Sequence, residues 1–139
     1  MIKSRQKILF LCTGNSCRSQ MAEGWVRHLH GNRIAAWSAG IEKHGLNPMA
    51  VKAMKTAGVD ISGYHSKLLD ELSHIQFDLV ITVCGHADEH CPLFSGATRV
   101  IHHGFDDPPL LAAKMHDENE KRACYLRVCL EIRDFIKTL

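Results

Sequence analysis

The sequence has no long hydrophobic run and no cluster of charges of one sign. Its N-terminal segment, residues 1–7, is polar, and the apolar stretch that follows is far too short for a signal peptide or a membrane-spanning helix. The formal net charge is only +2, and there is no run of lysine or arginine. Neither a membrane surface nor a nucleic acid is therefore expected as a partner, and a cytoplasmic location is predicted.

Internal repeats, linkers and low-complexity segments are also missing, so residues 1–139 are expected to form one domain. A chain of 139 residues can bury a core without disulfides or metals. Six cysteines would indicate a disulfide scaffold only in a small secreted protein, and here they are expected to remain thiols. Cys124 and Cys129 lie in a helical stretch and are interpreted as packing residues.

Strand and helix patterns alternate along the chain. They predict an α/β fold, a three-layer sandwich in which helices flank a four-stranded parallel sheet. The strands are expected at residues 7–11, 33–38, 79–83 and 98–102, and the main helices at 17–30, between Asn47 and Gly58, and at 117–138. Ser66 is expected to cap a further short helix. Ligands of such sheets bind beyond the carboxyl ends of the strands, where Cys12, Cys84 and residues 105–108 should converge.

The first strand pattern leads into a loop that begins with Cys12 and ends with Arg18. Together with Arg18, the candidate substrate-binding residues are Thr13, Gly14, Asn15, Ser16 and Cys17. A loop between a strand and a helix points backbone N–H groups into one concavity, which attracts an oxyanion, and the arginine adds a planar two-pronged donor. The same field favours the thiolate of Cys12. The loop therefore predicts covalent chemistry on phosphate or on an anion of its shape, with Cys17 expected to be a spectator.

A second pair of cysteines follows the third strand pattern. Cys84 and Cys91 are seven positions apart, so a continuous helix would hold their Cα atoms about 10 Å apart. A disulfide requires Cα atoms within about 7 Å. The pair can therefore bond only if the segment unwinds, which Gly85 and Pro92 favour.

Two other interpretations of this segment compete with a redox pair. The cysteines could serve in packing, although polar residues flank both of them. A zinc site would use Cys84, His86, His90 and Cys91, with His102 and His103 as further candidates. The usual Cys-x-x-Cys spacing is missing, and adjacent residues such as His90 and Cys91 do not easily reach one metal. No metal is therefore predicted.

A candidate acid follows the fourth strand pattern. Cleavage of an oxygen from a tetrahedral oxyanion under attack by a thiolate requires a proton for the departing oxygen. Asp106 and Asp107 precede Pro108, which biases Asp107 toward an extended backbone, so that its carboxyl group can face an anion pocket. An ordinary capped turn explains these residues equally well.

Taken together, these motifs resemble those of the thioredoxin-coupled arsenate reductases, which share the low-molecular-weight protein tyrosine phosphatase fold. The likeness covers nearly all of the chain and is carried by residues 12–25, 38–41, 84–92 and 104–108. The first segment fits reductases and phosphatases alike, whereas Cys84 and Cys91 favour the reductases. Asp107, directly before proline, matches the family's general acid better than Asp106 does.

The resemblance implies a reaction that needs no cofactor. It assigns catalysis to Cys12, Arg18, Ser19, Asp107, Cys84 and Cys91. The first cysteine attacks arsenate held by the arginine and the loop amides, the serine helps to keep its thiolate, and the aspartate protonates the leaving oxygen. The second cysteine attacks the first, arsenite leaves with two electrons, and the third cysteine attacks the second. Thioredoxin, or a thioredoxin-like reductant, then reduces the final disulfide.

Some members of this family bind potassium near the loop. Asn15, Glu23 and Ser38 stand at matching positions, but two further ligand positions, threonine and aspartate elsewhere, are His65 and Lys67 here. An ammonium group in place of a carboxylate opposes cation binding. Lys67 is therefore expected to supply the positive charge beside Glu23.

Two functions of other classes stay open. A phosphatase of the same fold is one, but relatives of that kind carry aromatic residues just after the Asp-Pro pair, and residues 109–111 are proline and two leucines here. The other is a non-enzymatic arsenite or metal sensor, which would use Cys12, Cys84 and Cys91 and consume no reductant. The modest charge and the absence of a coiled-coil pattern favour a monomer.

Overall fold

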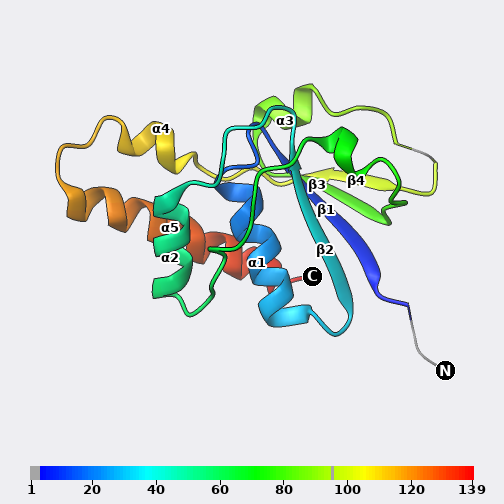
Figure 1. Ribbon diagram of the computed structural model, residues 1–139, viewed down its shortest axis with the longest axis horizontal. Coiled ribbons are helices and arrows are strands. Elements are labelled where there is room, and N and C mark those ends of the chain that lie inside the picture. The colour runs from blue at the N-terminus through cyan, green and yellow to red at the C-terminus, as the bar shows by residue number, and fades with distance from the viewer. Residues whose placement is uncertain (1–3, 95) are drawn as a thin grey trace.

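A computed structural model describes residues 4–94 and 96–139, so the predicted domain of residues 1–139 includes four positions (1–3 and 95) outside the described residues. Its centre is a parallel four-stranded sheet in the order β2-β1-β3-β4 (Figure 1). The strands are β1 (Gln6–Cys12), β2 (Ile34–Gly40), β3 (Leu79–Thr82) and β4 (Arg99–His102). The helices are α1 (Arg18–His30), α2 (Pro48–Thr56), the 3-10 helix η1 (Leu69–Leu72), α3 (Gly85–Glu89), α4 (Pro108–Ala112) and α5 (Glu118–Ile136). The predicted α/β fold is confirmed.

Strand β1 lies inside the sheet and pairs with β2 on one side and β3 on the other. Its apolar run, Ile8 to Leu11, is at most 1% exposed, which shows that both faces of the strand are covered. Burial of each such side chain stabilises the fold by about 1.5–3 kcal/mol. Cys12 comes at the carboxyl end of this strand, paired with Gly40, so the most firmly held part of the sheet positions the candidate nucleophile.

Helices α1, α2 and α5 lie together on one side of the sheet, with η1 and α3 away from this group (Figure 1). The indole Nε1 of Trp25 on α1 donates to the carbonyl of Cys129 on α5 at 3.1 Å and ties the two helices together. On α5, Tyr125, Val128 and Ile132 are buried. Although α5 has 19 residues, none of the helices in the described ranges is both long and apolar enough to cross a membrane.

The helix predicted between Asn47 and Gly58 is present as α2. Asn47 Oδ1 accepts from the backbone N–H of Met49 at 2.8 Å, and Pro48 occupies the first helical position. Gly58, just after the helix, has a φ of +96°, a left-handed conformation in which glycine carries no steric penalty.

The predicted cap at Ser66 is wrong. Its hydroxyl donates to the carbonyl of Asn15 at 2.7 Å, and η1 begins only at Leu69. The N-terminus of η1 is closed instead by Glu71, whose carboxylate accepts from the N–H of Leu68 at 2.7 Å. Asn15 is fully buried, so its carbonyl oxygen requires a hydrogen-bond donor. The Ser66 hydroxyl makes this long-range contact and therefore does not cap a helix.

Candidate active site

The loop between β1 and α1 borders a small cavity of about 250 Å³ at the carboxyl edge of the sheet. Its lining residues are Cys12, Thr13, Gly14, Ser16, Cys17, Arg18, His44, Asn47, Asp107 and Pro109. All but one of the predicted substrate-binding residues are therefore at the cavity, and the exception, Asn15, is buried and does not line it. Sites for drug-sized ligands usually measure about 300–1,000 Å³, so this cavity suits a smaller molecule.

Asn15 supports the loop through Ser19. It has a φ of +48°, in the left-handed region that asparagine tolerates better than most residues. Its Nδ2 donates to Ser19 Oγ at 2.9 Å, and Ser19 Oγ lies 2.8 Å from Cys12 Sγ. Because the serine oxygen already accepts from Asn15, its own hydrogen is free to point at the sulfur. This arrangement favours negative charge on Cys12.

The orientation of the Asn15 amide is itself fixed by neighbouring donors. Its Oδ1 accepts from the backbone N–H of Lys67 at 2.8 Å and from Gln20 Nε2 at 3.1 Å. The Nδ2 atom must then face Ser19. No buried side-chain nitrogen or oxygen in the described part of the chain lacks a hydrogen-bond partner, so this polar network is fully satisfied.

A segment after β2, residues 41–47, which we call the strap, runs along the outside of the loop. Four of its N–H groups donate to loop carbonyls: Ile41 to Cys12 at 3.2 Å, Glu42 to Thr13 at 2.7 Å, His44 to Gly14 at 3.0 Å and Asn47 to Ser16 at 3.0 Å. These four bonds use carbonyls of the loop and none of its N–H groups, which are the donors that an anion requires. Sequence reasoning missed the strap, since the pairing of two non-regular segments leaves no periodic pattern to detect.

Arg18 is held across the cavity by the segment after β4. Its Nη1 donates to the carbonyl of Phe105 at 3.0 Å, and its Nη2 lies 3.5 Å from Asp107 Oδ2. Asp106 points elsewhere and pairs with Arg127 at 3.1 Å. Of the two aspartates, only Asp107 lines the cavity, in agreement with the choice that the resemblance favoured.

Cys84 lies against the loop, whereas Cys91 does not. The Cys84 sulfur is buried, 3.3 Å from Thr13 Oγ1, and it accepts the N–H of Ala87 at 3.4 Å at the N-terminus of α3. Helix α3 ends at Glu89, so Cys91 follows it and is half-buried outside the cavity. Burial raises the pKa of Cys91, and Asp88 raises it further. All six cysteines are free thiols.

Cys17 lines the cavity but is only 4% exposed. Burial raises its pKa strongly, the proximity of Cys12 adds to the increase, and Arg18 opposes it. A thiol with these surroundings stays protonated at neutral pH and is a poor nucleophile. The prediction that Cys17 is a spectator agrees with this environment.

The histidines next to the cysteines make no metal cluster. Among residues 4–94 and 96–139, no group of three or more histidine, cysteine, aspartate or glutamate side chains is arranged to hold a metal ion. His86 and His90 pack against each other, with ring centroids 4.3 Å apart, and His102 Nδ1 lies 2.8 Å from Thr82 Oγ1. The zinc interpretation therefore has no geometric support.

The buried carboxylate of Glu23 lies among the residues compared above with a potassium site. Glu23 is 3% exposed and is bound by Arg27 at 3.0 Å, by the hydroxyl of Ser38 at 2.7 Å and by Lys67 at 3.9 Å. Burial lowers the pKa of Lys67, while Glu23 opposes that shift. The predicted Lys67–Glu23 pair is present, and Arg27 is a second cation that sequence reasoning did not assign to it.

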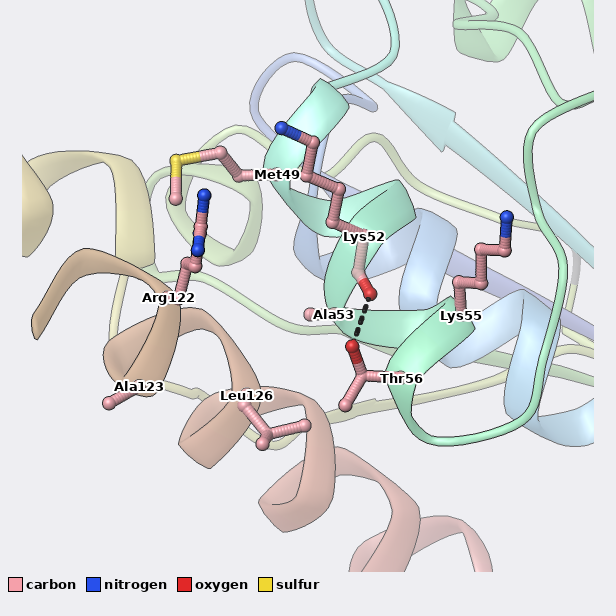
Figure 2. Close-up of a pocket in the computed structure, with 8 residues that line it drawn as sticks. All are labelled: Met49, Lys52, Ala53, Lys55, Thr56, Arg122, Ala123 and Leu126. Atoms are coloured by element: carbon pink, nitrogen blue, oxygen red, sulfur yellow. Dashed lines mark hydrogen bonds between the residues drawn. The ribbon is translucent and has the colours of Figure 1, made fainter. Parts of the chain in front are cut away.

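A larger cavity, about 590 Å³, lies away from this site between α2 and α5 (Figure 2). Residues of both helices line it, apolar ones such as Met49 and Leu126 together with the basic residues Lys52, Lys55 and Arg122. It contains none of the residues that carry the loop chemistry, and its size does not make it the catalytic centre.

Known proteins match this chain over most of its length. The sequence pattern of the family described as low molecular weight phosphotyrosine protein phosphatase matches residues 7–105. An arsenate reductase of Bacillus licheniformis is 51% identical over 134 residues, 96% of this chain and 94% of the relative. One from Bacillus subtilis is 50% identical over 130 residues, 94% of this chain and 91% of the relative. A solved arsenate reductase in the oxidized state superposes with a TM-score of 0.80 at 27% identity, covering 96% of this chain and 95% of the other.

Proposed function

The chain belongs to the low molecular weight phosphotyrosine protein phosphatase family, and from its similarity to arsenate reductases we propose that it reduces arsenate with a relay of three cysteines. The observation that carries this proposal is the position of the Cys84 thiol, which lies 3.3 Å from Oγ1 of Thr13, the residue that follows Cys12 in the loop. A phosphatase needs one cysteine and a water molecule. A second thiol beside the loop and a third farther out serve a reaction that must dispose of an oxidised sulfur.

The first step uses the part of the site that the phosphatases share. The Cys12 thiolate attacks arsenic, and an As–S bond forms as one As–O bond breaks. Arg18 and the loop N–H groups hold the remaining oxygens, and the Asp107 carboxyl group gives its proton to the oxygen that leaves. Ser19 Oγ lies 2.8 Å from the Cys12 sulfur, so its hydroxyl can donate to the thiolate and stabilise it before attack.

The next step is the reduction itself. Cys84 attacks the Cys12 sulfur, a Cys12–Cys84 disulfide forms, and the As–S bonding pair stays on arsenic, which leaves as arsenite. Arsenic gains two electrons and the two sulfurs lose them, so the electrons balance. The N–H of Ala87, at the N-terminus of α3, donates to the Cys84 sulfur and fixes its position beside the loop.

Cys91 completes the relay by attacking Cys84, which releases Cys12 as a thiolate and leaves a Cys84–Cys91 disulfide. Helix α3 has five residues and ends before Cys91, so little helix must unwind to bring the two sulfurs together. We infer that thioredoxin or a thioredoxin-like protein then reduces this disulfide by thiol exchange. The protein would act as a cytoplasmic monomer.

The decisive experiment separates the shared step from the relay. The variant Cys84→Ser should lose arsenate turnover in the presence of a thioredoxin system and should keep any hydrolysis of a small aryl phosphate, because that reaction ends at Cys12. The matched control is Cys124→Ser, a buried α5 cysteine away from the cavity. Loss of both activities in a folded Cys84→Ser protein would contradict this division of roles.

A second measurement distinguishes an enzyme from a stoichiometric sensor. Protein exposed to arsenate without reductant should release one arsenite per chain and show Cys84 and Cys91 joined by mass spectrometry. A sensor would bind arsenite with all thiols still reduced, and it would not oxidise thioredoxin when arsenate is added.

A further inference from the structure

The strap places a histidine ring directly on the anion loop. An ideal Cβ atom built on Gly14 would fall 2.2 Å from His44 Nδ1 and 2.4 Å from its Cγ. Only glycine, which has no Cβ, permits this close approach. The ring and the Gly14 backbone are therefore in direct contact, and both line the cavity around Cys12.

His44 is also held in this position. Its backbone N–H donates to the Gly14 carbonyl at 3.0 Å, and its Nε2 lies 2.6 Å from Glu42 Oε2. Because a carboxylate only accepts, Nε2 carries the proton of this hydrogen bond. Glu42 is in turn fixed by its N–H, which donates to the Thr13 carbonyl at 2.7 Å. Gly45, with a φ of +85°, turns the chain directly after the ring.

The ring stands at the border between the cavity and solvent. The His44 side chain is 50% exposed, yet it contributes to the lining of a cavity of about 250 Å³ that also contains Asp107 and Pro109. A free tetrahedral oxyanion has no substituent and fits wholly inside such a space. An ester of the same anion must extend its organic group out through the mouth, where the ring stands.

We propose that His44, held by Glu42, is a specificity-determining residue that narrows the mouth of the cavity and selects a free inorganic oxyanion over an aryl ester. The proposal rests on the proposed function, because the selected substrate is the free anion that the relay reduces. Selection acts by steric exclusion of the ester group, and the ring takes no part in bond making.

The test measures an ester and a free anion on the same protein without the relay. In the variant His44→Ala, kcat/KM for p-nitrophenyl phosphate should rise about tenfold or more, because one steric contact in a pocket typically changes selectivity by such a factor. The inhibition constant of inorganic phosphate should change much less, because the loop and Arg18 still bind it. The control is His74→Ala, an exposed histidine near η1 that does not line the cavity.

A second variant covers the case in which His44→Ala does not fold. Glu42→Ala keeps the histidine but removes the carboxylate that holds its ring. The ring can then move aside, so kcat/KM for p-nitrophenyl phosphate should also rise, by a smaller factor than in His44→Ala. Ester kcat/KM at or below the wild-type level in both variants, or a fall in ester and phosphate affinity in equal proportion, would overturn the proposal. Arsenate turnover is assayed separately. If the wild-type protein reduces no arsenate, the proposed function is wrong, but ester kcat/KM and the phosphate inhibition constant still test the role of His44.

Discussion

Removal of the Ser19 hydroxyl gives the most direct test of the site's electrostatics. The Oγ atom is fully buried and lies between two partners, 2.8 Å from Cys12 Sγ and 2.9 Å from Asn15 Nδ2. The variant Ser19→Ala deletes both contacts and adds no bulk. It therefore has two separable consequences, one for the reactivity of the thiolate and one for the stability of the fold.

The first consequence is chemical. A hydrogen bond to a charged group contributes about 1.5–3 kcal/mol, and this one favours only the ionised sulfur of Cys12. A tenfold change corresponds to about 1.4 kcal/mol, so the rate of alkylation of Cys12 at pH 7 should fall about 10- to 100-fold. The rate is measured with iodoacetamide by mass spectrometry of the peptide that contains Cys12.

The second consequence is structural. Asn15 Nδ2 loses its acceptor inside the protein, which costs about 1–3 kcal/mol. For a domain of this size, each kcal/mol lowers Tm by about 4 °C, so a decrease of about 4–12 °C is expected by calorimetry. Ser73→Ala, at an exposed serine after η1, is the control. An unchanged alkylation rate in folded Ser19→Ala protein would refute the role assigned to this hydroxyl.

Three further predictions follow from charges and burial. Replacement of Asp88 by asparagine should lower the pKa of Cys91, because this carboxylate adds to the increase caused by burial, and alkylation of Cys91 at pH 7 should be faster. The pKa of Cys17 is raised above that of the unfolded chain, so its contribution to stability is complete below about pH 8.5 and is lost as the pH rises, by at most about 1.4 kcal/mol per pH unit. In urea titrations from pH 8 to 10, the free energy of unfolding should therefore decrease less steeply with pH for Cys17→Ala than for the wild-type protein. Because Lys67 pairs with Glu23, potassium in place of sodium should leave Tm and activity unchanged.

Each of these predictions has a matched control and a contradicting result. Glu89→Gln removes a neighbouring charge that does not act on Cys91, and equal acceleration in both variants would refute the Asp88 effect. Cys124→Ala removes another buried thiol. If it changes the pH dependence of the free energy of unfolding as much as Cys17→Ala does, the effect is not specific to Cys17. A marked rise of Tm in potassium would show that Lys67 does not replace the cation.

Local sequence patterns predicted most of the fold. The apolar runs at residues 8–11 and 79–83 predicted central parallel strands, and the observed β1 and β3 are buried there. The Asn47-Pro48 pair marked the start of α2 because capping is a local hydrogen bond between neighbours in sequence. Ser66 was misassigned for the opposite reason, since its hydroxyl bonds to Asn15, 51 positions away.

The sequence by itself determined that a cysteine and an arginine lie in one loop at the end of a strand, because they are only six positions apart in the chain. The strand pattern also predicted that Cys84 and residues 105–108 approach this loop. Only the tertiary structure decided which of the two adjacent aspartates faces it, that Cys84 contacts it at Thr13, and that a histidine from another segment lies against it. The physical reason is range: chain connectivity and periodicity act over a few residues, whereas contacts between distant loops depend on how the whole sheet and its helices pack.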